Sequence, residues 1–380
     1  MKIGIITLSP ELNYGGILQA YALCRVLSGM GHEPEVICIR KRWALPWHRK
    51  PWAYTKRAVK KYILRRPAWI HYEEKVEREW PILVQHTIKF VEKYISRHEY
   101  ESYCYIQPHD YDGFIVGSDQ VWRPYYFGGD IADAYLRFTQ GWNVKRIAYA
   151  ASFGVDDWQY NSIQTRECSQ LAKSFDAISV RELSGVDLCR KHLGIEALHM
   201  ADPTLLLSAA DYETLIADLP VSHQQEILNY ILDWNDAKRQ LVEDVETTTG
   251  MHSFRVNSRY EEWDAPTEER IQPSVESWLQ GFRDASMVLT DSFHACVFSI
   301  IFCKPFYVVG NKKRGLTRIT SLLAAFGLED RLVDSITSID LSASIDWGKV
   351  NEKKEKMRNV ALKFLTEACA GKQVLEHSET

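Results

Sequence analysis

The chain has 380 residues, of which 46% are hydrophobic and 25% charged, and its formal net charge is −4. This length allows two domains of ordinary size with apolar cores and excludes a small module held together by disulfides. The composition is that of a globular protein, no apolar run is long enough to cross a bilayer, and the small net charge by itself indicates neither nucleic acid nor membrane as a partner.

The chain opens with the pattern of a strand, a loop, a helix and a second strand. Residues 2–8 (KIGIITL) are almost wholly apolar, the loop SPELNYGG follows, and ILQAYALCRVLSGMG repeats apolar residues at helical spacing until it ends at glycine. Residues 34–39 (PEVICI) resemble a further strand. This order predicts a βαβ unit with a parallel sheet. The opening residues lack the pattern of a signal peptide, so we expect a cytoplasmic protein.

The next segment mixes cations with tryptophans. Residues 40–66 hold eleven Lys and Arg and no Asp or Glu, so their formal charge is +11. Because the net charge of the whole chain is −4, the other residues carry a net charge of −15. Residues 40–69 also contain Trp43, Trp47, Trp52 and Trp69. Three interpretations are open: a solvated face, a nucleic-acid-binding segment, or a segment that lies on an anionic membrane. We interpret residues 40–100 as an insertion with one or two helices.

Strand-like and helix-like stretches alternate after the insertion. GFIVGSDQVW, RIAYAAS, AISV and ALHMADPTLLL complete a first domain near residue 207, and EILNYILDW, SFRVN, MVLT and PFYVVG recur between helices in the second half. The pattern predicts two doubly wound α/β domains, residues 1–207 and 208–380, that face each other across a cleft. Ligands of such sheets bind beyond the carboxyl ends of the strands, so the cleft is the expected site.

Polar residues and an aromatic residue follow most of these strands directly. They are Asn13, Asp119, Gln120, Trp122, Arg181, Asp202, Asp291, Ser292 and His294. Each has an ordinary explanation when taken singly, as a helix cap, a turn, a core residue or a surface ion pair. Their common location at the expected cleft makes them candidates.

His294 stands out because it lies in the first turn of the helix that Ser292 is predicted to open. Free backbone N–H groups and the positive end of the helix dipole favour an anion there. A phosphate at this position would meet amides, the Ser292 hydroxyl and an imidazole together. Lys312 and Arg318 are among the cations that follow the next strand, and we expect at least one of those cations to complete an anion site.

Seven stretches of the chain occur in a defined order: NYGGILQAYAL, FIVGSDQVW, YAASFG, ISVRE, ADPTLLL, TDSFHACVFSIIFCKPF and RITSLLAAFGLEDRL. This ordered set resembles the polysaccharide pyruvyltransferase family, from Asn13 to Leu332. The resemblance implies a glycosyltransferase-B-like pair of Rossmann-type domains. It also implies transfer of pyruvate from phosphoenolpyruvate to two hydroxyls of a sugar, which forms a cyclic ketal and releases phosphate. Phosphoenolpyruvate is then a co-substrate, and we expect no other cofactor and no metal.

The resemblance assigns donor-side roles to particular residues. His294 and Arg181 match family residues expected near the phosphoenolpyruvate. His294 is our candidate for the general acid–base catalyst. Ser292 stands where some branches of the family carry an arginine. We therefore expect Lys312 or Arg318 to supply the missing cation, and we expect the C-terminal domain to be the donor side.

The acceptor side is expected on the N-terminal domain. Asp119 is our candidate to accept the proton of an acceptor hydroxyl, and we expect Asn13, Gln120 and Trp122 to line a sugar subsite. Aromatic faces stack well on the apolar faces of pyranoses, which is the reason for including Trp122.

The resemblance also favours the membrane interpretation of residues 40–69 over nucleic acid, because polysaccharide units are often built on a lipid diphosphate at the cytosolic membrane face. We expect a cytoplasmic enzyme of capsule or exopolysaccharide synthesis, peripheral on that membrane, whose acceptor is a sugar in a polysaccharide or a lipid-linked oligosaccharide. Two alternatives stay open. One is a nucleotide-sugar-dependent glycosyltransferase on the same fold, and the other is a non-catalytic protein that binds glycans or membrane surfaces.

Overall fold

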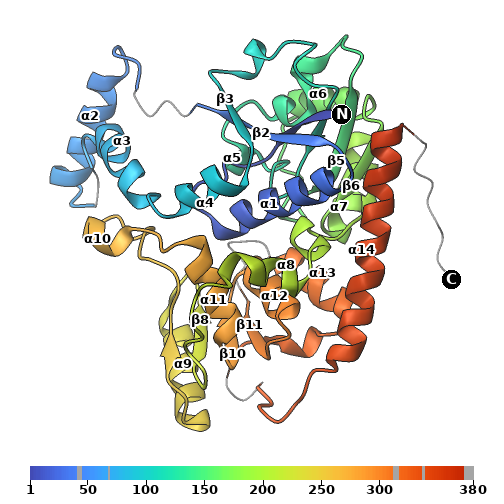
Figure 1. The fold of residues 1–380 in the computed structure, drawn as a ribbon. Helices are drawn as coiled ribbons and strands as arrows, with labels where there is room; N and C mark the ends of the chain where they lie inside the picture. The colour runs from blue at the N-terminus through green and yellow to red at the C-terminus, as the bar shows by residue number, and fades with distance from the viewer. Residues whose placement is uncertain (41–44, 67–68, 311–315, 336–338, 372–380) are drawn as a thin grey trace.

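The computed structural model describes residues 1–40, 45–66, 69–310, 316–335 and 339–371. These residues form two α/β domains, the N-terminal one above the C-terminal one in Figure 1, and each domain is built on a parallel sheet. The predicted fold class, two Rossmann-like domains, is confirmed.

The N-terminal sheet has the strand order β3-β2-β1-β4-β5-β6-β7, with all neighbours parallel. Its strands are β1 (Lys2–Ile6), β2 (Glu33–Ile39), β3 (Arg97–Tyr100), β4 (Gly113–Val116), β5 (Lys145–Ala151), β6 (Ala177–Val180) and β7 (Leu198–His199). The order reverses between β1 and β4, and ligands of such sheets bind at this reversal. The loops after β1 and β4 leave the sheet side by side, because Ile6 lies opposite Val116.

The helices of this domain include α1 (Tyr14–Gly29), α5 (Pro124–Phe127), α6 (Ser162–Ala172) and α7 (Leu183–Leu188). Nearly every residue of α1 is buried. Its sequence, YGGILQAYALCRVLSG, is apolar on almost all sides, which is typical of a helix enclosed by a core. The N-terminus of α1 is therefore held firmly where the loop after β1 ends.

The C-terminal sheet has the order β12-β11-β10-β8-β9, and its strands are also parallel. The strands are β8 (Ile227–Tyr230), β9 (Ser253–Phe254), β10 (Met287–Thr290), β11 (Phe306–Val309) and β12 (Leu332–Val333). The helices include α9 (Asp236–Thr249), α11 (Val275–Asp284), α12 (Phe293–Ile301) and α13 (Leu316–Phe326). All nine residues of α12 are buried, as its apolar sequence FHACVFSII predicts.

The predicted insertion is largely helical. It contains α2 (Lys50–Ala58), a π-helical turn (Val59–Ile63), α3 (Tyr72–Leu83) and α4 (Thr87–Tyr94). The sequence predicts that the insertion ends near residue 100. This boundary is wrong, because Arg97–Tyr100 forms strand β3, which pairs with β2 at the edge of the sheet. Figure 1 shows α2 and α3 projecting away from the rest of the N-terminal domain.

Helix α3 connects the insertion to the C-terminal domain. Arg270, at the end of α10 (Thr267–Arg270), donates from Nη1 to Glu79 Oε2 at 2.7 Å, and both side chains are buried. Beside this pair, the Tyr72 and Trp263 rings lie 5.2 Å apart, and Lys75 Nζ donates to the Trp263 carbonyl oxygen. This contact holds the two domains together on one side of the molecule.

The last helix, α14 (Trp347–Ala370), crosses from one domain to the other, as Figure 1 shows. Phe364 packs against Tyr149 of β5 with ring centroids 6.0 Å apart, and Arg358 Nε donates to the Leu206 carbonyl oxygen at 2.8 Å. The sequence assigns residues 208–380 to the C-terminal domain as one block. The structure differs for this helix, because its later turns complete the apolar core of the N-terminal domain.

The contact between α3 and α10 can be tested by removing one charge. We expect Glu79→Ala to lower the free energy of unfolding by about 3–5 kcal/mol, because Arg270 would remain buried without its partner. Urea unfolding measures the effect. Glu77→Ala, an exposed position on the same helix, is the matched control and is expected to change stability by less than about 0.5 kcal/mol. Equal effects of the two substitutions would show that the buried pair does not hold the domains together.

Candidate active site

A cavity of about 750 Å³ lies between the two domains. Its walls include the loops after β1, β4, β8, β9 and β10 and the first turns of α1, α12 and α13. The structure thus has a cavity at the carboxyl ends of the strands, where the sequence predicts the site.

A chain of buried charges lies against this cavity. Arg181, which directly follows β6, donates from Nη1 to Asp202 Oδ2 at 2.7 Å and from Nη2 to Asp119 Oδ1 at 3.3 Å. The second oxygen of Asp202 accepts from the backbone N–H and the hydroxyl of Thr204, at 3.0 and 2.7 Å. The Arg181 and Asp202 side chains are almost completely buried. This pairing fixes the Asp119 carboxylate at the cavity wall.

The aspartates of this network are held in their charged form. Burial would raise the pKa of Asp202, but His294 and Arg181 outweigh it and lower that pKa well below its ordinary range. Burial likewise opposes ionisation of Asp119, and Arg181, His294 and Arg318 together lower its pKa. Asp119 is therefore available as a carboxylate, the form that accepts a proton.

His294 is placed between the two domains. Its Nε2 lies 3.7 Å from Asp202 Oδ2, and its other edge faces Gly15, where a Cβ would lie only 2.0 Å from Nδ1. Only glycine allows the ring so close to α1. Next to it, Tyr14 stacks on Trp278 of α11 with centroids 5.5 Å apart, which brings this end of α1 against the C-terminal domain.

Phe293, in the cavity wall, has two arginine side chains against its ring. The Arg181 and Arg318 guanidinium groups lie over its ring, 4.7 and 5.6 Å from the centroid. Burial and repulsion by Arg181 lower the pKa of Arg318 to about 10, although Asp119 Oδ1 lies 3.9 Å from its Nη1. An anionic ligand in the cavity would therefore favour the charged form of Arg318.

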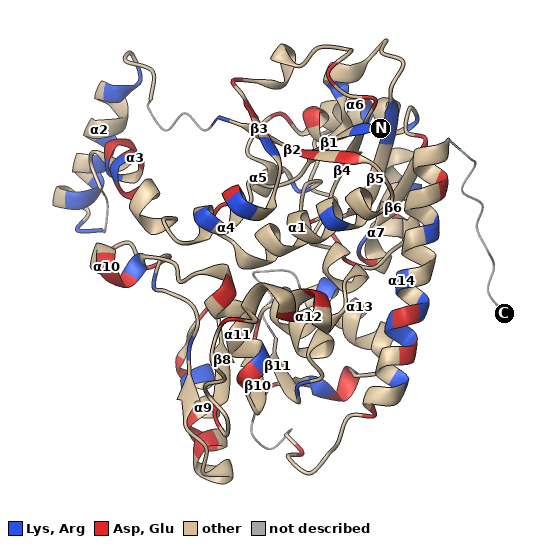
Figure 2. Ribbon diagram, in the orientation of Figure 1, with Lys and Arg blue, Asp and Glu red and all other residues tan. Residues whose placement is uncertain are grey.

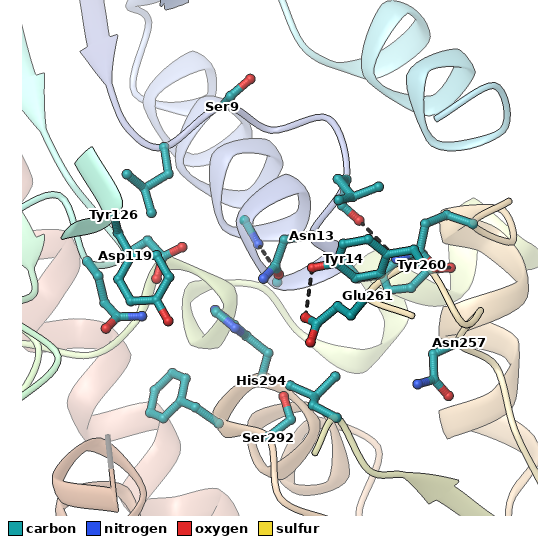
Figure 3. A pocket seen from close by; sticks show the side chains of 18 of the residues that line it. Ser9, Asn13, Tyr14, Asp119, Tyr126, Asn257, Tyr260, Glu261, Ser292 and His294 are labelled. Atoms are coloured by element: carbon teal, nitrogen blue, oxygen red, sulfur yellow. Dashed lines mark hydrogen bonds between the residues drawn. The ribbon is translucent and has the colours of Figure 1, made fainter. Parts of the chain in front are cut away.

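The polar residues at the start of α12 have two different roles. Asp291 accepts from the backbone N–H groups of Leu232 and Asp233 and from Lys238 Nζ at 2.6 Å, so it holds the loop after β8 in place. Ser292 is the N-cap residue, but its hydroxyl makes no cap hydrogen bond and lines the cavity instead. Figure 3 shows Ser292 and His294 together at this wall.

The predicted acceptor residues do not all reach the cavity. Asn13 caps α1 by accepting from Gly16 N–H at 3.2 Å, and both Asn13 and Gln120 line the cavity. Trp122 does not, and this prediction was wrong. It is fully buried, stacks on Tyr135 with centroids 4.8 Å apart, and donates from Nε1 to a backbone carbonyl, so a sugar cannot stack on its face.

The predicted donor residues are also separated. His294, Ser292 and Arg318 line the cavity together, whereas Arg181 lies behind the wall and acts on the cavity through Asp119 and Phe293. Lys312 lies outside the described residues. The roles of these residues in a reaction stay predictions.

Sequence reasoning missed the central position of Asp202 and the presence of Tyr126 in the cavity wall. Asp202 follows a predicted strand, which places it at the correct end of the sheet, but its partners are 21 and 92 positions away, at Arg181 and His294. Tyr126 lies in the short helix α5 and has no sequence signal. Within the described ranges, no group of three or more His, Cys, Asp and Glu is placed to hold a metal ion.

A family model described as polysaccharide pyruvyl transferase matches residues 13–313. The chain belongs to this family. It is therefore a transferase that acts on polysaccharides, and it needs a sugar acceptor. A comparison with curated proteins finds no match.

Solved structures with a related fold are distant in sequence. UDP-GlcNAc 2-epimerase from Neisseria meningitidis bound to UDP-GlcNAc is 10% identical, with a TM-score of 0.45, over 97% of this chain and 100% of the other. E. coli heptosyltransferase WaaC with ADP-2-deoxy-2-fluoro heptose is 14% identical, with a TM-score of 0.36, over 81% and 88%. S. aureus MnaA with UDP is 13% identical, with a TM-score of 0.46, over 98% and 92%. Similarity at this level carries no argument about function, and the fold assignment rests on the strand orders above.

The contact between Gly15 and His294 gives a direct test of the site. We expect Gly15→Ala to displace the His294 ring, because its Cβ would occupy the space next to Nδ1. The change can be followed by the NMR signals of the His294 ring. Gly29→Ala, in the same helix with nothing within 4 Å of its Cβ position, is the matched control and is expected to leave the ring unchanged. An unshifted His294 signal in Gly15→Ala would contradict the close packing.

Proposed function

We propose that the chain transfers pyruvate from phosphoenolpyruvate to two hydroxyls of a sugar, forms a cyclic ketal and releases phosphate. The observation that carries the proposal is the arrangement of His294, Asp119 and Arg318 around one cavity at the start of α12. A histidine, a carboxylate and a buried cation thus lie around one cavity, in a chain of the polysaccharide pyruvyl transferase family.

The donor is proposed to lie against the first turn of α12. Backbone N–H groups of that turn, the Ser292 hydroxyl and the Arg318 guanidinium suit a small ligand with a phosphate and a carboxylate. Arg318 is buried and its pKa is lowered by burial and by Arg181, so a bound anion would stabilise its charge. Asp119 opposes the anion, which favours a donor position closer to Ser292 and Arg318 than to that carboxylate.

The proposed chemistry uses His294 and Asp119 in turn. His294 protonates the methylene carbon of phosphoenolpyruvate, which makes C2 an oxocarbenium-like electrophile, and Asp119 accepts the proton of the sugar hydroxyl that adds to C2. The C2–O bond to phosphate then breaks, and the second hydroxyl closes the ring. Of the two hydroxyl protons, one balances the proton gained by the methyl group and the other leaves with phosphate. Positioning of the reactants and charge stabilisation supply the remainder of the catalysis.

We also propose that residues 40–69 bind an anionic membrane. No residue of α2 or of the following π-helical turn is buried, and Trp47, Trp52 and Tyr62 are 84%, 71% and 67% exposed. Figure 2 shows Lys and Arg on α2, which carries no Asp or Glu. Exposed indoles among cations suit the interface of anionic lipids. Among the described helices, none has the length and apolarity to cross a membrane.

Turnover can be measured with phosphoenolpyruvate and a pool of nitrophenyl glycosides. We expect phosphate release together with the mass gain of a pyruvate ketal, and we expect His294→Asn to lower kcat by about 10²–10⁴-fold. His109→Asn, an exposed histidine outside the cavity, is the control and should retain activity. Unchanged phosphate release by His294→Asn would refute the assigned role. Release of UDP from UDP-sugars, with no ketal, would instead support a glycosyltransferase.

Membrane binding can be measured by pelleting with vesicles that contain phosphatidylglycerol. Replacing Arg49, Lys56, Lys60 and Lys61 by Ser should weaken pelleting about 100-fold or more, since each cation near the surface contributes about 1 kcal/mol. A control with the same charge change, Ser at Lys349, Lys353, Lys356 and Lys363 of α14, should pellet like wild type. Equal pelleting of both variants would remove the proposal.

A further inference from the structure

The cavity is larger than a three-carbon donor requires. Pockets of about 300–1,000 Å³ hold whole drug-sized ligands, and this one is about 750 Å³. Figure 3 shows Asp119 and Tyr126 on one side of His294 and Asn257, Tyr260 and Glu261 on the other. Space beyond the donor therefore extends to a wall that belongs to the C-terminal domain.

Arg255 belongs to that far wall and directly follows β9. Among the described residues, it makes no hydrogen bond and no salt bridge. Partial burial, with repulsion by Arg239 and Arg259, lowers its pKa even though Glu262 opposes the shift. Its positive charge is therefore poorly compensated where it faces the cavity.

Trp234, which follows β8, makes cation–π contacts with two guanidinium groups. Arg255 lies 5.0 Å and Arg239 5.5 Å from its ring centroid. Arg239 is exposed to solvent beside the cavity rather than in its lining, and no carboxylate of the described residues lies within salt-bridge distance of it. The neighbouring Arg259 differs, because it is paired with Glu262 and with Glu269, each at 2.5 Å. Of the two arginines in this wall, Arg255 is thus the one without an ion pair among the described residues, although Glu262 lies near enough to act on its charge.

Two neighbouring guanidinium groups match a ligand with two negative charges better than a single carboxylate. Guanidinium groups also pair with phosphate oxygens in a bidentate geometry. The buried Nε1–H of Trp234 has no acceptor among the described residues, which agrees with a site rich in donors. The far wall therefore has the chemistry of a phosphate site, separated from the donor end by His294.

We propose that Arg255, Arg239 and Trp234 form a second anion subsite that binds a phosphate or diphosphate group attached to the acceptor sugar. The identification of the ligand as the acceptor rests on the proposed function. Binding of the phosphate or diphosphate group can be measured without turnover. The subsite would hold the acceptor by its charged end while its hydroxyls reach Asp119 and His294.

Calorimetric titration with inorganic diphosphate tests the subsite. We expect Arg255→Gln to weaken diphosphate binding at least about tenfold, since a charge-assisted hydrogen bond is worth about 1.5–3 kcal/mol. The same variant should bind phosphoenolpyruvate like wild type, whereas Arg318→Gln should show the opposite pattern. Arg166→Gln, an exposed arginine of α6 outside the cavity, is the matched control and should change neither affinity.

The outcomes separate this proposal from the proposed function. Diphosphate binding that is unchanged in Arg255→Gln, equally weakened in Arg166→Gln, or absent in the wild type overturns the subsite. Absence of phosphoenolpyruvate turnover, with binding to Arg255 intact, overturns the reaction and leaves the subsite. Parallel titrations with UDP, a sugar 1-phosphate and citronellyl diphosphate then show whether a nucleotide, a free sugar phosphate or a lipid carrier supplies the phosphate.

Discussion

The ion pair between Arg181 and Asp202 is the interaction on which the site depends. Both groups are almost fully buried, and a buried charge is costly unless it is paired and hydrogen-bonded. Asp202 is paired with Arg181 and accepts hydrogen bonds from Thr204. Arg181 is paired with Asp202 and Asp119, although its buried Nε has no hydrogen-bond partner among the described residues. The same carboxylate lies beside His294 of the other domain. The position of the histidine is thus coupled to the integrity of the N-terminal core.

The cavity is bounded by domains that contact each other in several separate places. Helix α3 meets α10 through Glu79 and Arg270, the start of α1 meets α11 through Tyr14, and α14 packs on both domains. Tyr14 also lines the cavity, whereas Glu79, Arg270 and α14 lie outside its lining. The distance between the wall that carries Asp119 and the wall that carries His294 is therefore set partly by packing remote from these groups, and an acceptor must match that distance.

Much of this architecture could be predicted from local patterns, and the failures have physical reasons. Apolar runs followed by polar residues identify Asp119 and His294, because strands of a parallel sheet end at a common edge. The same logic fails for Trp122, where the backbone turns back to bond with Ser152 and carries the ring beneath the sheet edge. Strand β12 has two residues, too few for a periodic signal. The pairing of Arg255 with Trp234 depends on contacts between separate strands, which no local pattern contains.

The course of α14 affects how the protein is made. The apolar surface of the N-terminal sheet beside Tyr149 is covered by Phe364 and its neighbours, which are translated more than two hundred residues later. During synthesis on the ribosome, this first-made surface stays open to water until the final helix emerges. A nascent chain that stalls before α14 would therefore expose an apolar surface. Chaperones that recognise exposed apolar side chains could bind this surface throughout the translation of the second domain.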